Sequence, residues 1–211
     1  MAFSDYKNIS QVQKRYNIRY EEINFIAASG LVPPAGFAEE IKISREHIDV
    51  FSSEASRCEV IVFPLLREVW KNYRKIYSLW IQKSILCDDD LAGIPDYIIA
   101  ARSPLGKTVL ESPLIIVAEA KKNDFELGWG QCLAGLLAAQ KINGDRDFPV
   151  QGIVTDGKFW EFGRLCEDIF TKNIQSYTVD DLSTLFGVLN FVFQSAEKKI
   201  LKDRHISSEE T

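Results

Sequence analysis

Three charged residues flank two short apolar runs in the middle of the chain. Asp96 opens the run 95–100, and Glu119 and Lys121 close the run 115–121. Because side chains alternate along a strand, Glu119 and Lys121, two residues apart, face the same side of a sheet. If the two runs pair as a hairpin, all three charges meet at one sheet end. Two carboxylates beside an ammonium predict a divalent-metal site with a cationic helper.

The chemistry that such a site supports is hydrolysis of a phosphodiester. A Mg²⁺ ion (with Mn²⁺ as a substitute) held by Asp96 and Glu119 would neutralise charge growing on the phosphate and assist the attacking water. Lys121 would orient that water or stabilise developing negative charge. In a partly buried pocket beside a cation we expect the pKa of Lys121 to fall, which adds a proton-transfer role. The alternative for Glu119 and Lys121 is a plain same-face ion pair.

Together, these motifs resemble a known family. Pro95-Asp96, then Glu119-Ala120-Lys121 after an apolar strand, then Gln131 on the following helix resemble the PD-(D/E)xK nuclease superfamily. Upstream, the segment 53–57 leading into 62–66 is similar to the opening helix of nuclease domains in type I restriction subunits. The resemblance covers the chain from about Glu54 to Leu165.

The resemblance implies a restriction-endonuclease-like core and a Mg²⁺-dependent deoxyribonuclease that acts on DNA. It implies that Asp96, Glu119 and the Ala120 carbonyl hold the metal, with Lys121 as the catalytic lysine. Glu54 would be an outer carboxylate that reaches a metal-bound water or a second ion. Gln131 would orient water or a phosphate oxygen; taken alone, it is a surface amide.

The elements that must position these residues follow from apolar patterning and turn signals. We expect a helix capped by Ser52 or Ser53 that reaches about Tyr73, kinked or restarted at Pro64. The strands and helices that follow are expected at 76–86, 95–100 and 113–120 (strands), 126–142 (a helix rich in small residues), 150–155 and 159–165 (a hairpin with an Asp-Gly turn), and from about 182 (a helix). This order predicts an α/β (α+β) fold with a central mixed sheet flanked by helices.

The domain organisation follows from the same reading. Residues 1–50 form an N-terminal accessory segment in which no chemistry is visible. Residues 51–203 form the nuclease-like domain, and residues 204–211 a polar tail.

The net charge of the chain limits how it can bind nucleic acid. A net charge of −5 argues against coating nucleic acid through bulk electrostatics. The segment 66–84 nevertheless has a local basic excess, which either contacts phosphates or forms a solvated helix face. Its basic residues are Arg67, Lys71, Arg74, Lys75 and Lys83, against Glu68 alone.

Cysteine spacing and hydropathy predict where the protein works. The four cysteines include no CxxC pair, which indicates reduced thiols rather than a zinc cage or a disulfide framework. No apolar run is long enough to span a membrane, and the start lacks the features of a secretory signal. We therefore expect a cytoplasmic protein that meets no membrane, either as a homodimer or as a subunit of a larger assembly.

Two competing readings stay open. The first is a non-catalytic nucleic-acid or protein binding or regulatory module on the same fold. The second is an unrelated α/β protein in which the motif is accidental, and a structure that separates Asp96 from Glu119 would support it.

Overall fold

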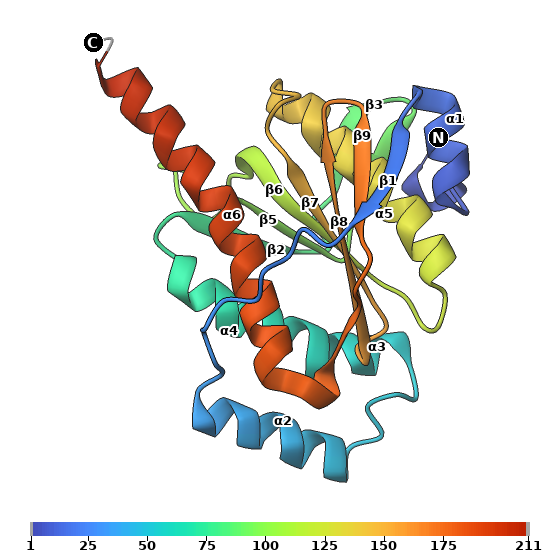
Figure 1. The fold of residues 1–211 in the computed structure, drawn as a ribbon, viewed down its shortest axis with the longest axis vertical. Helices are drawn as coiled ribbons and strands as arrows, with labels where there is room; N and C mark the ends of the chain where they lie inside the picture. Colours follow the sequence, from blue (N-terminus) through green and yellow to red (C-terminus); the bar gives the residue numbers. More distant parts are fainter. Residues whose placement is uncertain (1, 210–211) are drawn as a thin grey trace.

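The chain folds around one mixed β-sheet with helices on both faces (Figure 1). A computed structural model describes residues 2–209, with side chains through residue 197. The strand order is β1-β9-β8-β7-β6-β5-β2, and the short β10 pairs with β8. The strands of this sheet are β1 (Arg19–Ile23), β2 (Tyr77–Ile81), β5 (Tyr97–Ala101), β6 (Glu111–Ala120), β7 (Val150–Thr155), β8 (Phe159–Cys166), β9 (Ile169–Asn173) and β10 (Tyr177–Thr178). The predicted mixed sheet flanked by helices is confirmed.

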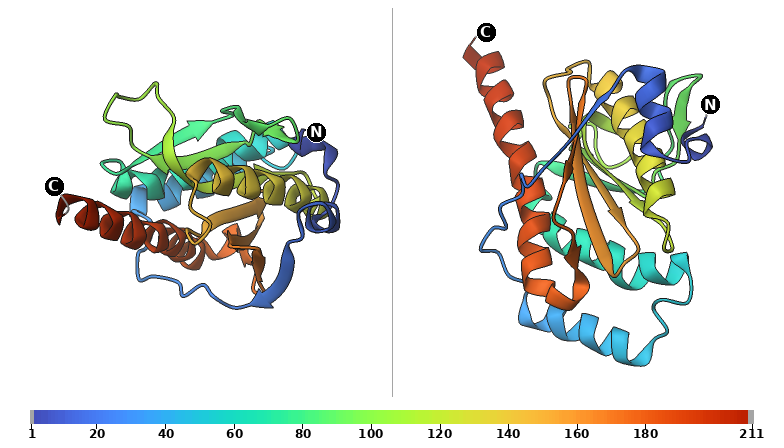
Figure 2. Two further views of the ribbon diagram at one scale, coloured as in Figure 1. Left: turned by 90° about the horizontal axis from the view of Figure 1, so that it is seen from above. Right: turned by 45° about the vertical axis from the view of Figure 1, so that its right-hand side comes forward.

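Each face of the sheet carries its own hydrophobic core. One core packs α2, α4 and α6 against the sheet, and the other packs α5, α1 and a small hairpin, β3–β4. Figure 2 shows α6 and α5 on opposite sides of the strands. The elements of these layers are α1 (Ile9–Tyr16), α2 (Ala35–His47), α3 (Glu54–Arg57), α4 (Phe63–Tyr73), α5 (Phe125–Asn143), α6 (Leu182–Glu209), β3 (Ile85–Asp88) and β4 (Leu91–Gly93).

The predicted hairpin of the two central strands is confirmed. β5 and β6 are antiparallel, with Tyr97 opposite Ala118. Asp96 directly precedes Tyr97, and Glu119 directly follows Ala118. The two carboxylates therefore lie at the same end of the antiparallel ladder. β6 and β7 are parallel and joined through α5, with Ala120 opposite Thr155. This crossover places the start of α5 just beyond the carboxyl end of β6.

The single strand predicted over residues 76–86 is wrong. β2 ends at Ile81, and Gln82 takes a positive φ of 45°, which ends the extended conformation. The chain then leaves the main sheet, and β3 pairs with β4 in a separate two-stranded hairpin. Asp88 ends β3, and Asp89 and Asp90 form the turn of this hairpin.

The helix expected around Pro64 is built from three segments. α3 is capped by Ser53, whose hydroxyl accepts a hydrogen bond from the Ser56 N–H at 3.0 Å. A π-helical segment, Cys58–Val62, leads into α4, where Pro64 lies in the first turn. Proline is tolerated there because its missing N–H leaves few hydrogen bonds unmade. The chain therefore continues through Pro64 with a change of helical pitch.

The N-terminal residues join the main sheet and the core. β1 extends the sheet by pairing in parallel with β9, and α1 and its preceding turn cover α5. Phe3, Tyr6 and Val12 are buried there. Within the part of the chain that the structure describes, no helix is both long and apolar enough to cross a bilayer. At the other end, residues 204–209 of the expected polar tail continue α6, and residues 210–211 lie outside the described residues.

Candidate active site

The charged residues at the ends of β5 and β6 converge on one point. The Lys121 Nζ lies 3.3 Å from Glu119 Oε2 and 3.6 Å from Asp96 Oδ2. It also donates a hydrogen bond to the Ala120 carbonyl oxygen at 3.2 Å. One ammonium is therefore surrounded by three oxygens, from Asp96, Glu119 and the main chain of Ala120.

The strand ends fix each member of this cluster. Asp96 Oδ2 accepts a hydrogen bond from the Ala120 N–H at 2.8 Å, so the carboxylate is tied to the neighbouring strand. Glu119 lies opposite Val154 in the β6–β7 ladder. Gly128 of α5 packs over both strands, because a Cβ at Gly128 would lie 2.6 Å from Val154 Cγ1 and 3.3 Å from Lys121 Cγ. The small residues of α5 thus allow the helix to begin against the site.

Glu119 is the most deeply buried member, with a side chain only 4% exposed. Burial raises the pKa of Glu119 to about 8, partly offset by Lys121. The negative charge of Asp96 and a side-chain hydrogen bond between the two carboxyl groups raise the pKa further. Such a carboxyl group favours an added proton or an added cation near neutral pH.

Lys121 keeps its charge in this setting. Burial opposes the ammonium, but the carboxylates of Glu119, Asp96 and Glu54 outweigh it, and the pKa of Lys121 is raised. The fall in pKa expected from the sequence is therefore not found, because the carboxyl groups of Glu119, Asp96 and Glu54 face the ammonium. The chemistry open to Lys121 here is electrostatic rather than proton transfer.

The two outer candidates are placed differently. Glu54 opens α3, is exposed, and lies close enough for its charge to act on Lys121. Gln131 is half-buried on α5, one turn beyond Gly128. Among the described residues, no hydrogen bond joins Gln131 to the carboxylates. The structure thus brings Asp96, Glu119, Ala120 and Lys121 together, with Glu54 at the rim.

A second ionic pair lies beside the cluster and was not anticipated from the sequence. Arg57 donates to the Asp156 carbonyl oxygen at 2.8 Å through Nη1, which also lies 3.6 Å from Asp156 Oδ2. Asp156 directly follows Thr155, whose carbonyl accepts the Lys121 N–H. The pair therefore holds α3, and with it Glu54, near the strand ends. The Asp-Gly turn was recognisable, but its arginine partner lies 99 residues away in the chain.

The donor set at the cluster suits a hard divalent cation. No group of three or more His, Cys, Asp or Glu side chains in the described part of the chain is arranged to hold a metal ion. A metal would therefore depend on Asp96, Glu119 and the Ala120 carbonyl, all oxygen donors. Magnesium retains several waters and needs only one or two protein carboxylates, so this set fits it.

Comparison with known proteins adds no assignment to this geometry. No protein-family model matches the chain, and no curated protein matches it in sequence.

Proposed function

We propose that the protein is a metal-dependent phosphodiester hydrolase, an endonuclease-like enzyme that acts on DNA, built on a restriction-endonuclease-like core. One observation carries the proposal: oxygens of Asp96, Glu119 and Ala120 surround a single cation position at 3.2–3.6 Å. Lys121 fills that position with its own ammonium. A site that gathers three oxygens around one positive charge is suited to a divalent ion.

Each residue then has a defined task. When bound, Mg²⁺ or Mn²⁺ supplies neutralisation of phosphate charge and a more acidic water. Asp96 and Glu119 hold the ion with the Ala120 carbonyl, and the hydrogen bond from the Ala120 N–H keeps Asp96 oriented. Lys121, a charged group on a flexible stem, stabilises the negative charge that grows on the phosphate. Glu54 and Gln131 are the outer groups proposed to orient water.

The test is nicking of plasmid DNA in the presence of Mg²⁺ or Mn²⁺. We expect Asp96→Ala and Lys121→Ala to reduce the rate by about 100-fold or more, as when one transition-state contact is removed. Lys122→Ala is the matched control, because Lys122 is the exposed neighbour and donates to the Ser52 carbonyl at 2.9 Å. Its rate should stay close to wild type. Equal rates in the wild type and all three variants would discard the proposal.

A non-catalytic binding or regulatory module on the same fold is the second candidate. The observation that favours it is that Lys121 already partly neutralises the two carboxylates without help from an ion. Calorimetry separates the two functions. Heat of Mg²⁺ binding that disappears in Asp96→Ala supports the hydrolase, and no heat of binding to the wild type supports the module.

A further inference from the structure

A second feature, which we call the basic–aromatic cleft, lies at the far end of the β2–β5 ladder. It is a cavity of about 580 Å³ between the end of α4, the edge strand β2 and the loop that follows β5. Four of its lining residues are cationic, two are tryptophans, and none is acidic. These six residues are Arg74, Lys75, Arg102, Lys107, Trp70 and Trp80.

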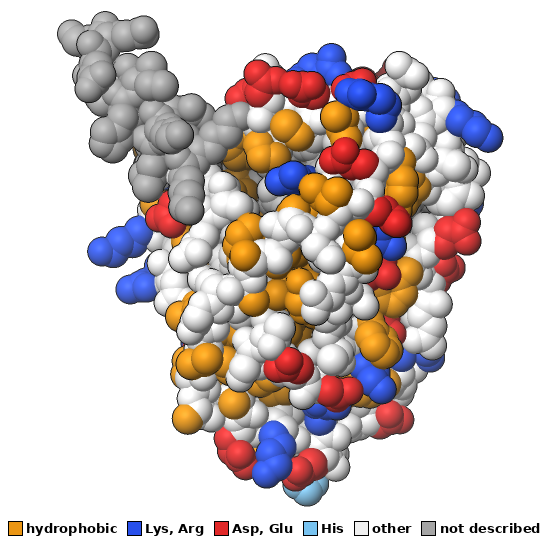
Figure 3. All heavy atoms as spheres, in the orientation of Figure 1, with side chains coloured by type: hydrophobic (Ala, Val, Ile, Leu, Met, Phe, Trp, Pro, Cys, Tyr) orange, Lys and Arg blue, Asp and Glu red, His pale blue; other side chains and the backbone are white. Residues whose placement is uncertain are grey.

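The described residues do not neutralise the four cations of the cleft. All four side chains are exposed, and none forms an ion pair with a residue that the structure describes. On the face shown in Figure 3, by contrast, acidic and basic side chains are interspersed. Four like charges around one cavity repel one another unless an anion lies among them. In a chain with a net charge of −5, this cluster indicates a polyanionic ligand.

The two tryptophans give the cleft fixed aromatic surfaces. Trp70 Nε1 donates to the Tyr77 carbonyl at 3.0 Å, and Trp80 Nε1 donates to Ser78 Oγ at 2.9 Å. The Lys83 ammonium lies 5.2 Å from the centre of the Trp80 ring, so a cation accompanies this ring as well. Aromatic rings beside phosphate-binding cations are the arrangement that holds unpaired bases, whereas the bases of a duplex are already stacked on each other.

The edge strand connects this cleft to the candidate active site. At one end of β2, the Gln82 N–H donates to the Asp96 carbonyl at 2.9 Å. At the other end, the Arg102 N–H donates to the Ile76 carbonyl at 2.8 Å. The five residues between them span about 17 Å at ~3.4 Å per residue. Trp80 lies between the two ends and Lys83 lies just beyond Gln82, so a bound strand would follow β2 from the cleft to Asp96.

We propose that the basic–aromatic cleft binds single-stranded nucleic acid, with its phosphates against the four cations and its bases on the tryptophan rings. The proposal extends the proposed hydrolase function by naming its substrate as single-stranded nucleic acid. It rests on that function only where it assigns the bound strand the role of substrate. Binding at the cleft itself requires neither Asp96 nor a metal.

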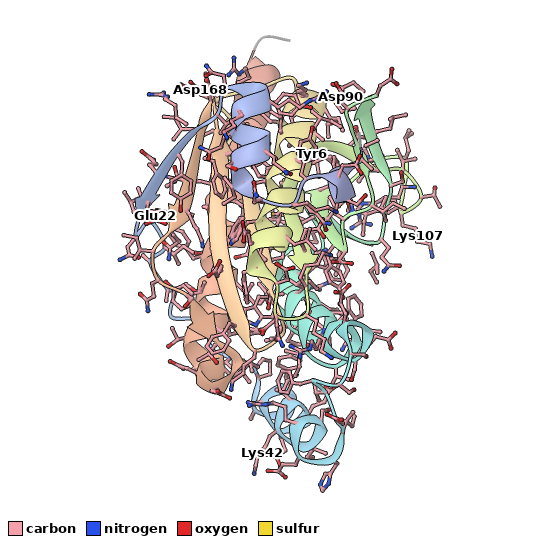
Figure 4. All side chains as sticks on the ribbon, turned by 90° about the vertical axis from the view of Figure 1, so that its right-hand side faces the viewer. Tyr6, Glu22, Lys42, Asp90, Lys107 and Asp168 are labelled. Carbon is pink, nitrogen blue, oxygen red and sulfur yellow. The ribbon has the colours of Figure 1, made fainter. Side chains whose placement is uncertain are left out.

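Binding is measured by fluorescence anisotropy of a labelled single-stranded DNA oligonucleotide in EDTA, so that no cleavage occurs. The test variant is Arg102→Ala/Lys107→Ala. The matched control is Lys14→Ala/Lys42→Ala, which removes two other exposed cations that form no ion pair within the described residues. Figure 4 shows Lys42 on α2, far from Lys107. Both pairs change the net charge equally, so bulk electrostatics is held constant.

We expect the cleft variant to bind on the order of tenfold more weakly or worse, and the control to bind like the wild type. The slope of log K against log salt should fall in magnitude by about 1.4, because two phosphate contacts are lost at ~0.7 each. Trp80→Leu should weaken binding by about 5- to 100-fold with the slope unchanged, because stacking is lost and no phosphate contact is. Thermal unfolding confirms that each variant is folded.

Several outcomes overturn the proposal. They are equal binding by the cleft and control variants, tighter binding of duplex than of single strand, and displacement of the strand by inorganic pyrophosphate at concentrations near those of the oligonucleotide. The two proposals fail separately. Loss of binding in the cleft variant with no metal-dependent nicking by the wild type leaves the cleft as the site of a binding module. Metal-dependent nicking by the wild type, together with equal binding by the cleft and control variants, supports the hydrolase and excludes the cleft as its binding site.

Discussion

Two buried ionic groups lie at neighbouring strand ends, and they differ in what they contact. In the Arg57–Asp156 pair, three of the five side-chain nitrogen and oxygen atoms form hydrogen bonds with the main chain. Arg57 donates to the carbonyls of Asp156 and Phe51, each at 2.8 Å, and only its buried Nε lacks a partner. Asp156 Oδ1 accepts the N–H groups of Lys158 and Phe159 at 2.9 and 2.7 Å. This pair fastens α3 to the turn between β7 and β8.

The Asp96–Glu119–Lys121 cluster is satisfied in another way. Among the described residues, the Glu119 carboxyl group meets only the side chains of Lys121 and Asp96. A carboxylate that is 4% exposed and has no main-chain donor contributes little to the architecture. Strongly shifted groups of this kind concentrate at functional sites. Both groups are buried and ionisable, so burial and charge alone do not identify a functional site. The two groups are distinguished by whether the main chain or other side chains contact the buried charge.

The largest effect we expect comes from breaking the structural pair. Arg57→Met should lower the free energy of unfolding by about 3–5 kcal/mol, because it leaves the Asp156 carboxylate buried without its cation. Urea unfolding at neutral pH measures this. The double variant Arg57→Met/Asp156→Asn should recover part of the loss, since no charge is then stranded. A loss below about 1 kcal/mol in Arg57→Met would place this pair among ordinary surface contacts.

The next effect concerns the pH dependence of stability through Glu119. Its pKa is raised by burial from 4.5 to about 8, so between these values the folded protein keeps a proton that the unfolded chain releases. Without metal, stability should therefore fall as pH rises through this window. Glu119→Gln cannot ionise. It should match the wild type below pH 4.5 and be more stable above pH 8, by on the order of 1–3 kcal/mol, in EDTA. A difference that does not change with pH would show that Glu119 is charged throughout.

The smallest effect separates the two groups by their response to metal. At about ten times its Kd, Mg²⁺ should stabilise the wild type by about 1.4 kcal/mol, because it binds the folded state alone. Asp96→Ala should lose this gain. Asp156→Asn should retain it, although its starting stability is lower. Thermal unfolding with and without Mg²⁺ measures all three proteins. If Mg²⁺ still stabilises Asp96→Ala by the same amount, the metal binds outside the cluster.

The sequence was enough to place the central hairpin and its charges. Glu119 and Lys121 share a face because strand geometry fixes it locally. The strand that begins after Asp96, β5, directly precedes β6 in the chain and is joined to it by a single loop. The two edges of the sheet were harder. β1 was missed because all five of its side chains are exposed and show no apolar alternation. Its partner strand β9 lies about 150 residues away in the chain, a pairing that no local pattern encodes.

Long-range partnerships account for the rest of what was missed. The local basic excess was visible, yet the structure divides it. Lys71 pairs with Glu68, while Arg74 and Lys75 join Arg102 and Lys107 in the basic–aromatic cleft. The loop that carries Arg102 and Lys107 contains Pro104 and Gly106. Such residues indicate a change of chain direction, but they do not indicate which part of the fold the loop will contact.

The most direct measurement of the central claim is a crystal structure soaked in Mn²⁺. We predict a single anomalous peak bound by Asp96, Glu119 and the Ala120 carbonyl oxygen, at about 2.0–2.2 Å from each. The Lys121 Nζ should have moved away from its present contacts of 3.2–3.6 Å with those oxygens. An Nζ that keeps these contacts at saturating Mn²⁺, with no peak at the cluster, would contradict the account.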